Sequence, residues 1–335
     1  MSRNPPRRRQ PAPPPVAQPH PYYPYPQQPR VVYYPRRRRP NQIAQFIQGW
    51  LIGFVGGSIL LCSAVATMAV MFPLERTNIL ILGVDRRPLE TTYVTRTDTM
   101  ILATVNPAQN YAGLLSIPRD LYVTLADGST GRINTAHFFA EAADTGSGPA
   151  AAVNTVRSNF GVDVHRFVRI DLVGFVAIVD AMGGVTVDVP NPLIDYEYPT
   201  YDYGTTTVAF EAGRQHMNGE QALAYARIRH GSSDFQRAER QQLVMASLMA
   251  QALKPTTWVR APLIAAAVTE AVHTDLTVVD ALRLAPTLLL VGPGNLDSRV
   301  IQDEMVQPTT TDGGASVLLP VWSAINPVLF EMFGQ

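Results

Sequence analysis

Residues 50–72 form an uninterrupted stretch of 23 residues that contains no charged side chain. As a helix rising about 1.5 Å per residue it would be about 35 Å long, enough to cross the roughly 30 Å hydrocarbon core of a bilayer. Such a stretch separates the chain of 335 residues into two parts that do not form one globule. We predict a tail over residues 1–42, a transmembrane helix over residues 43–73 and an extracytoplasmic domain over residues 74–335.

The segment before this stretch is built from residues that cannot form a core. Residues 1–42 contain 13 Pro and nine Arg, with no Asp or Glu. We therefore predict a disordered, partly polyproline-like tail. The arginine run at residues 36–39 has no counterpart after the uncharged stretch, so the positive-inside rule places the N-terminus in the cytoplasm. These arginines fit a lipid-facing role better than nucleic-acid binding, and we expect a single-pass protein of the cell membrane.

Two other interpretations of the apolar segment fit less well. Ala64-Val65-Ala66 looks like a signal-peptidase site, but more than 40 residues precede the apolar run, and the run continues to Phe72. A lipid anchor on Cys62 would require a small residue where Leu61 stands.

The charge and motif content excludes several classes of protein. The formal net charge is zero, but residues after 42 carry 27 − 9 = 18 basic against 27 acidic side chains, a net of −9. A single cysteine excludes a disulfide framework and a cysteine-based zinc or iron–sulfur site. No Walker A, G-x-S-x-G or dinucleotide glycine pattern is present, and the histidines lack metal-ligand spacing.

The long C-terminal part alternates apolar runs with helical patterns. Continuous apolar runs are typical of strands covered on both faces, and Asn218 with Gln221 forms a capping-box pattern at a helix start. This alternation predicts one domain of the α/β class, an α/β/α sandwich around a mixed central sheet. We expect strands at residues 78–84, 99–105, 113–117, 121–125 and 185–189, and helices at residues 149–160, 172–182, 220–226 and 234–253.

Each of the first three predicted strands borders an Arg/Asp pair. Ligands of open α/β sheets usually bind at the edge of the sheet formed by the carboxyl ends of its strands. One such pair would be an ordinary surface feature, but three in succession predict a site. The pairs are Asp85 and Arg86, Arg96 and Asp98, and Arg119 and Asp120.

A second group of polar residues follows the predicted helix at 220–226. Arg227 and Arg229 are two residues apart, Asp234 lies in the first turn of the next helix, and Arg237 and Gln241 share one face of that helix. Arginine forks match phosphate oxygens, and carboxylates among them can hold Mg²⁺ that bridges phosphates. Because Lys254 is the only lysine, clustering rather than the choice of arginine carries this argument. The pattern predicts a site for a pyrophosphate with Mg²⁺.

The ordered motifs resemble the LytR–CpsA–Psr family from about residue 77 to the C-terminus. They are NILILGVD, RTD, SIPRD, VDAMGGV, NGEQALAYARIR and D-x-x-R-x-x-R-Q. Members of that family are membrane-anchored phosphotransferases, which move a glycopolymer from a polyprenyl-pyrophosphate carrier to a hydroxyl of the cell wall, typically on peptidoglycan. The resemblance also implies an apolar cavity for the polyprenyl tail, whose lining the sequence does not identify.

The resemblance assigns roles to individual residues. Asp85 and Asp98 would bind Mg²⁺, with Arg119, Asp98 and Arg227 as the catalytic set. Asp120 and Asp234 would support the arginines, Asp98 or Asp234 could accept the acceptor's proton, and we expect Arg87 and Arg240 to be solvated. The pyrophosphate would be held by Arg86, Arg96, Arg119, Arg227, Arg229, Arg237 and Gln241.

Other functions remain open at this stage. They are a non-catalytic binder of polyprenyl-pyrophosphate lipids, a pyrophosphatase that uses water as acceptor, and a membrane-bound transcription regulator. No helix-turn-helix pattern supports the last, and we expect no nucleic-acid partner. Residues 195–203 carry four tyrosines beside acidic residues, a pattern that can stack on sugars but is more typical of an ordinary surface loop.

Overall fold

The computed structural model describes residues 42–71, 75–86, 92–201, 204–228 and 233–334. The predicted disordered tail therefore lies outside the described residues, except for its last residue. A helix, α1 (Gln42–Met71), covers most of the segment predicted to cross a membrane. Among the residues that the structure describes, no helix meets the length and apolarity that a bilayer crossing requires. The transmembrane span thus stays a prediction.

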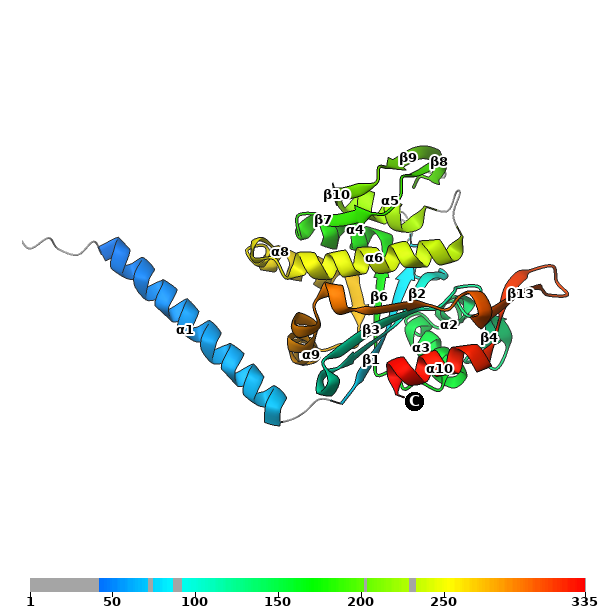
Figure 1. Ribbon diagram of the computed structural model, residues 1–335, viewed down its shortest axis with the longest axis horizontal. Helices are drawn as coiled ribbons and strands as arrows, with labels where there is room; N and C mark the ends of the chain where they lie inside the picture. Colours follow the sequence, from blue (N-terminus) through cyan, green and yellow to red (C-terminus); the bar gives the residue numbers. More distant parts are fainter. Residues whose placement is uncertain (1–41, 72–74, 87–91, 202–203, 229–232, 335) are drawn as a thin grey trace, which may run out of the picture. The chain divides into compact units, whose positions relative to one another are not determined.

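A six-stranded mixed sheet forms the centre of the domain that follows α1 (Figure 1). The strand order is β11 (Val272–Thr274), β6 (Arg166–Asp171), β1 (Thr77–Val84), β2 (Thr97–Asn106), β3 (Tyr111–Ser116) and β12 (Asp297–Val300). β1 is parallel to β6 and antiparallel to β2. β3 is antiparallel to β2 and parallel to β12.

Helices cover both faces of this sheet because side chains of β1 and β2 alternate between two apolar layers. Leu80 and Leu82 are fully buried in the larger core, where they pack with residues of α2 (Thr135–Ala143), α3 (Gly148–Phe160) and α10 (Trp322–Phe333). Ile101 on the opposite face packs near Ile81 and Met245 of α6 (Asp234–Ala252). The predicted mixed α/β fold with a central mixed sheet is confirmed.

A second core lies beyond α6 and joins three helices to two small sheets. Buried Val179, Val187, Tyr225 and Val244 belong to it. Figure 1 shows the elements other than α6 on the side of α6 away from the central sheet. The elements are α4 (Leu172–Ala181), α5 (Gly219–Arg227), α6, the pair β7 (Val185–Val189) and β10 (Gly213–Met217), and the pair β8 (Leu193–Pro199) and β9 (Thr205–Phe210).

The remaining elements complete the periphery. They are the pair β4 (Tyr122–Thr124) and β5 (Thr130–Arg132), the pair β13 (Val306–Thr310) and β14 (Ser316–Pro320), and the helices α7 (Pro255–Trp258), α8 (Ala261–Ala271) and α9 (Val278–Val291).

Side-chain caps fix where the site-bearing helices begin. Asn218 and Gln221 form the predicted capping box at the start of α5, and Ser233 and Gln236 form another before α6. These boxes satisfy backbone N–H groups that have no partner inside the helix, and they hold the first turns in place. Asp234 consequently occupies the first turn of α6, as predicted.

Two predicted strands form outside the central sheet, and one of its inner strands was missed. The runs at 121–125 and 185–189 become β4 and β7, each in a two-stranded sheet. β6, which lies beside β1, was not predicted because Arg166, Arg169 and Asp171 interrupt its apolar pattern.

Candidate functional site

The segments that carry the three Arg/Asp pairs lie at one edge of the central sheet because β1, β2 and β3 are antiparallel neighbours. Val84 at the end of β1 pairs with Thr97 at the start of β2, and Ser116 at the end of β3 pairs with Ile101. The loop after β1, the start of β2 and the loop after β3 therefore lie at the same edge. Asp85, Asp98 and Arg119 come from these three segments.

Arg119 is surrounded by three carboxylates from different elements. Its guanidinium nitrogens lie 3.0 Å from Asp98, 3.4 Å from Asp120 and 3.9 Å from Asp234. Burial by itself would lower the pKa of Arg119, but these carboxylates outweigh burial and raise it. Arg132 lies 3.3 Å from the second oxygen of Asp120, which fixes that carboxylate.

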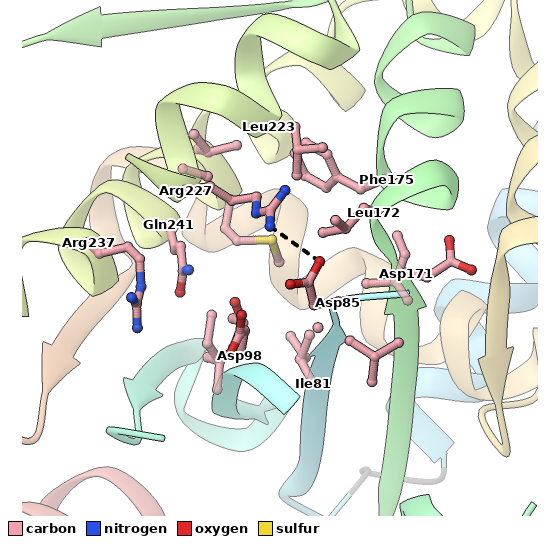
Figure 2. Close-up of a pocket in the computed structure, with 18 residues that line it drawn as sticks. Ile81, Asp85, Asp98, Asp171, Leu172, Phe175, Leu223, Arg227, Arg237 and Gln241 are labelled. Atoms are coloured by element: carbon pink, nitrogen blue, oxygen red, sulfur yellow. Dashed lines mark hydrogen bonds and ion pairs between the residues drawn. The ribbon is translucent and has the colours of Figure 1, made fainter. Parts of the chain in front are cut away.

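Arg227 and Asp85 connect the end of α5 to the end of β1. Arg227 Nη2 lies 3.2 Å from Asp85 Oδ1, and both side chains are partly exposed. Figure 2 shows this pair at the edge of a pocket. The pair spans 142 positions of sequence, so only the tertiary fold brings it together.

The first two turns of α6 close the opposite side. Arg237 Nη1 lies 2.6 Å from Asp234 Oδ1, one turn earlier, and the Arg237 side chain is largely buried. Gln241, a further turn along the helix, lines the same pocket as Arg237. In Figure 2 both side chains lie across the pocket from Asp85 and above Asp98. We call Asp85, Asp98, Arg119, Arg227, Asp234, Arg237 and Gln241 the rim.

Below the rim lies an apolar cavity of about 120 Å³ between the sheet and helices α4, α5 and α6. Its walls are the apolar side chains that the sequence could not identify. They include Ile81, Ile101, Ile170, Phe175, Leu223, Val244 and Met245. A smaller cavity beside it is lined by Arg119, Asp120 and Asp234 and shares Asp98, Arg237 and Gln241 with the first. The site thus combines a charged entrance with an apolar interior.

The charges around both cavities limit what can bind there. Leaving aside Asp171 and Asp120, which are paired with Arg86 and Arg132 outside the linings, three Asp and three Arg line the cavities, so the formal sum is 3 − 3 = 0. A pyrophosphate would add negative charge to this neutral set, and an additional cation would favour its binding. Asp85 and Asp98 line one cavity, and Mg²⁺ commonly binds one or two carboxylates together with phosphate oxygens.

The donor set therefore fits a magnesium ion that a phosphate ligand helps to coordinate. The described residues contain no group of three or more His, Cys, Asp or Glu placed to hold a metal without such a ligand.

Arg86, predicted to bind the pyrophosphate, lies away from the rim. Its Nε lies 2.7 Å from Asp171 Oδ2, and its guanidinium stacks 4.6 Å from the centre of the Tyr93 ring. Asp171 also caps α4 by accepting a hydrogen bond from the backbone of Gly174. Asp85 lines the cavity and Arg86 does not, because Asp171 and the Tyr93 ring hold the Arg86 guanidinium.

The other predicted basic residues have mixed outcomes. Arg96 is exposed and does not line either cavity. Arg87 and Arg229 lie outside the described residues. The expectation of a solvated Arg240 is wrong: it is buried, and it donates hydrogen bonds to the carbonyls of Tyr225 and Ile228 at the end of α5.

A buried cluster that the sequence did not reveal lies behind Arg86. Arg169 Nη1 contacts Glu141 at 3.2 Å and the His137 ring at 3.3 Å, and its guanidinium stacks 4.0 Å from the Tyr93 ring. We call Arg86, Tyr93, His137, Glu141, Arg169 and Asp171 the inner cluster. Its members are spread over 86 positions from Arg86 to Asp171, and no spacing in the sequence marks them.

The fold and the site define an α/β protein whose charged sheet edge opens onto an apolar cavity, which suits a ligand with an anionic head and an apolar tail. The chain belongs to the LytR_cpsA_psr family, whose profile matches residues 69–320.

Named relatives share part of the chain. It is 35% identical over 180 residues to the polyisoprenyl-teichoic acid–peptidoglycan teichoic acid transferase TagU of Oceanobacillus iheyensis, covering 53% of this chain and 52% of that protein. It is 31% identical over 194 residues to TagV of Bacillus subtilis, which bears the same transferase name, covering 56% and 47%. The chain thus spans about half the length of these curated relatives.

Solved structures agree on the fold. The crystal structure of Bacillus subtilis TagV superimposes with a TM-score of 0.61 at 25% identity, covering 78% of this chain and 98% of that one. The protein gbs0355 of Streptococcus agalactiae shares the fold with a TM-score of 0.63 at 24% identity, covering 80% and 91%.

Proposed function

We propose that this protein is a Mg²⁺-dependent phosphotransferase that moves a glycopolymer from a polyprenyl-pyrophosphate carrier to a hydroxyl of a cell-wall glycan of the peptidoglycan type. The observation that carries the proposal is the charged rim above the apolar cavity (Figure 2). The names of TagU and TagV, which describe transfer of a polyisoprenyl-linked teichoic acid to peptidoglycan, support the same class of reaction.

The two parts of the site would receive the two parts of the donor. The isoprenoid end of the lipid would enter the cavity among Phe175, Leu223 and Met245. Its pyrophosphate would then reach the rim, where Arg119, Arg227 and Arg237 present guanidinium groups that match phosphate oxygens.

The transfer forms one bond and breaks another. The acceptor hydroxyl oxygen bonds to the phosphorus that carries the glycan, the bridging P–O bond breaks, and polyprenyl phosphate leaves. Mg²⁺ held by Asp85 and Asp98 would supply positive charge next to the phosphoryl oxygens. Arg119 and Arg227 would stabilise the negative charge that develops on those oxygens and on the leaving phosphate.

A carboxylate of the rim would accept the proton of the acceptor hydroxyl. Asp98 and Asp234 are the two candidates, since both contact Arg119 and line the cavity beside it. Asp234 is the more exposed of the two, 44% against 27% of the side chain, and so is easier for an acceptor to reach. A general base must lie within hydrogen-bond reach of the proton it takes.

A membrane location would bring the enzyme to its lipid donor. The uncharged stretch at residues 50–72 and the preceding arginine run support a single-pass anchor with a cytoplasmic N-terminus and an extracytoplasmic domain.

Release of polyprenyl phosphate from a glycan-bearing polyprenyl pyrophosphate tests the proposal. We expect the purified full chain to release it with Mg²⁺, to lose this activity in EDTA, and to form a phosphodiester-linked glycan product only when a wall glycan is added. Mass spectrometry of both products measures the outcome. Binding without turnover would indicate a lipid-binding protein, and equal turnover without acceptor would indicate a pyrophosphatase; either result would contradict the proposal.

A further inference from the structure

A third hollow, an open cleft, lies next to the rim between the β8–β9 hairpin and helix α5. Its volume is about 380 Å³, within the range of about 300 to 1,000 Å³ typical of small-molecule sites. Unlike the apolar cavity, it is lined by aromatic and polar side chains together. They include Tyr198, Tyr201, Glu220, Gln221 and Arg227.

Helix α5 supplies one wall of this cleft. Glu220, Ala224 and Arg227 lie four and three residues apart, which places them on one face of the helix. The small side chain of Ala224 at the centre leaves room between the two charged residues. The wall thus offers an acceptor at one end and a donor at the other.

The β8–β9 hairpin supplies the opposite wall, and its strand pairing is irregular there. The register of β8 against β9 shifts between Asp195 and Tyr198. Such bulges re-aim side chains. Tyr196 is accordingly 71% exposed and does not line the cleft, whereas Tyr198 is half-buried and does.

Tyr201 and Glu220 form a hydrogen-bonding pair at the outer end. The Tyr201 hydroxyl lies 3.2 Å from both oxygens of the Glu220 carboxylate. Burial and the nearby Glu220 charge raise the pKa of Tyr201 to about 12, so its phenol stays protonated. Aromatic faces beside carboxylate and amide groups suit a sugar ring, which has apolar C–H faces and hydroxyls around its edge.

Arg227 connects this cleft to the proposed phosphate site. It lines both the cleft and the apolar cavity, and it pairs with Asp85 on the cavity side. A group in the cleft would therefore lie beside the same Arg227 side chain that faces a phosphate at the rim.

We propose that the cleft formed by Tyr198, Tyr201, Glu220 and Gln221 is a carbohydrate subsite, which holds a pyranose ring of the glycan next to the reacting phosphate. This inference rests on the proposed function and deepens it. The ring belongs either to the glycan of the donor lipid or to the wall glycan that accepts it, and the same chemistry recognises both. The tyrosine-rich segment, which the sequence favoured as an ordinary surface loop, thereby acquires a role.

Binding measurements with three probes separate this inference from the proposed function. The probes are a soluble peptidoglycan-type glycan strand, a glycan-bearing polyprenyl pyrophosphate and a glycan-free polyprenyl pyrophosphate, each titrated into the full chain with Mg²⁺. We expect Tyr198→Ala and Tyr201→Ala to lower the affinity for at least one glycan probe about tenfold or more, while the affinity for the glycan-free lipid stays the same. If the variants bind the soluble strand more weakly, the ring in the cleft belongs to the acceptor glycan. If they bind only the glycan-bearing lipid more weakly, the ring belongs to the donor glycan.

The matched control is Tyr196→Ala, which removes an exposed tyrosine from the same hairpin. Tyr201→Phe keeps the ring but loses the contact with Glu220, so it distinguishes loss of a hydrogen bond from misfolding of the hairpin. The inference is overturned if both alanine variants bind every glycan probe as the Tyr196→Ala control does. If the wild-type chain fails to bind the glycan-free lipid, the proposed function fails, while the soluble strand still tests the cleft.

Discussion

The rim and the inner cluster are both built around arginine–carboxylate pairs, but they differ in how far these pairs are buried. Arg119 of the rim keeps 21% of its side chain exposed beside three carboxylates, and its pKa is raised. Arg169 of the inner cluster is 4% exposed with one carboxylate, Glu141, and burial lowers its pKa. The rim thus combines three carboxylates with three arginines and keeps part of these side chains exposed to a ligand. In the inner cluster, Arg169 and Glu141 are almost fully buried and are paired with each other.

This difference separates residues that can bind a ligand from residues that hold the fold. In a buried ion pair, each charge is occupied by its partner and is not available to a ligand. Removing one partner leaves the other as an unpaired charge in apolar surroundings. A solvent-facing network can exchange protein partners for ligand oxygens. We therefore expect substitutions in the inner cluster to reduce stability, and substitutions in the rim to reduce activity.

The largest effect on stability should come from Glu141→Ala. This change leaves the Arg169 guanidinium buried without its carboxylate and removes the acceptor for the backbone N–H groups of Gly146 and Gly148. Removing one partner of a buried ion pair typically costs about 3–5 kcal/mol of unfolding free energy. Thermal or urea unfolding measures the loss, with the exposed Glu270→Ala as the matched control. A loss no greater than that of the control would show that the inner cluster does not hold the fold.

The next effect should be on activity, from Arg119→Ala. Removing one preorganised group that stabilises transition-state charge typically lowers kcat by about 100- to 1,000-fold. We expect release of polyprenyl phosphate to fall by this factor, while the melting temperature changes less than in Glu141→Ala. Arg119→Lys should recover part of the rate, because it restores charge without the planar fork. Arg214→Ala, at an exposed position of β10, is the control, and a wild-type rate in Arg119→Ala would remove Arg119 from the site.

Much of the rim could be predicted from the sequence because its strands are neighbours in the chain and in the sheet. β1, β2 and β3 follow one another, so the order of the charged residues at their ends is enough to indicate a shared edge. The capping boxes in turn locate the starts of α5 and α6, and hence the positions of Arg227 and Arg237.

The remaining features depend on contacts between distant segments. Arg86 follows Asp85 directly in the sequence, but its partner Asp171 belongs to β6, a strand whose charged residues conceal it. Arg240 looks solvated at the charged start of a helix, yet it is buried against the last carbonyls of α5. The apolar walls of the cavity resemble any other core residues, because the sequence does not show where helices leave a space.

The smallest expected effect is a pH dependence of stability that comes from His137 of the inner cluster. His137 is fully buried in the inner cluster, where its Nδ1 lies 3.0 Å from the carbonyl oxygen of Thr95. Burial lowers the pKa of His137, the Thr95 carbonyl opposes this, Arg169 lowers it further and Glu141 raises it, with a net decrease. In the unfolded chain the histidine has its ordinary pKa of about 6.5.

Below pH 6.5 the unfolded state therefore binds more protons than the folded state, and stability falls as the pH decreases. One such group changes the unfolding free energy by at most about 1.4 kcal/mol per pH unit. Urea unfolding of the wild type and of His137→Gln at a series of pH values from 8 to 5, on the order of half a unit apart, isolates this contribution. The variant should show a shallower decline than the wild type, since glutamine does not titrate. Parallel curves would mean that folding leaves the pKa of His137 unchanged, which would contradict a closed inner cluster around this histidine.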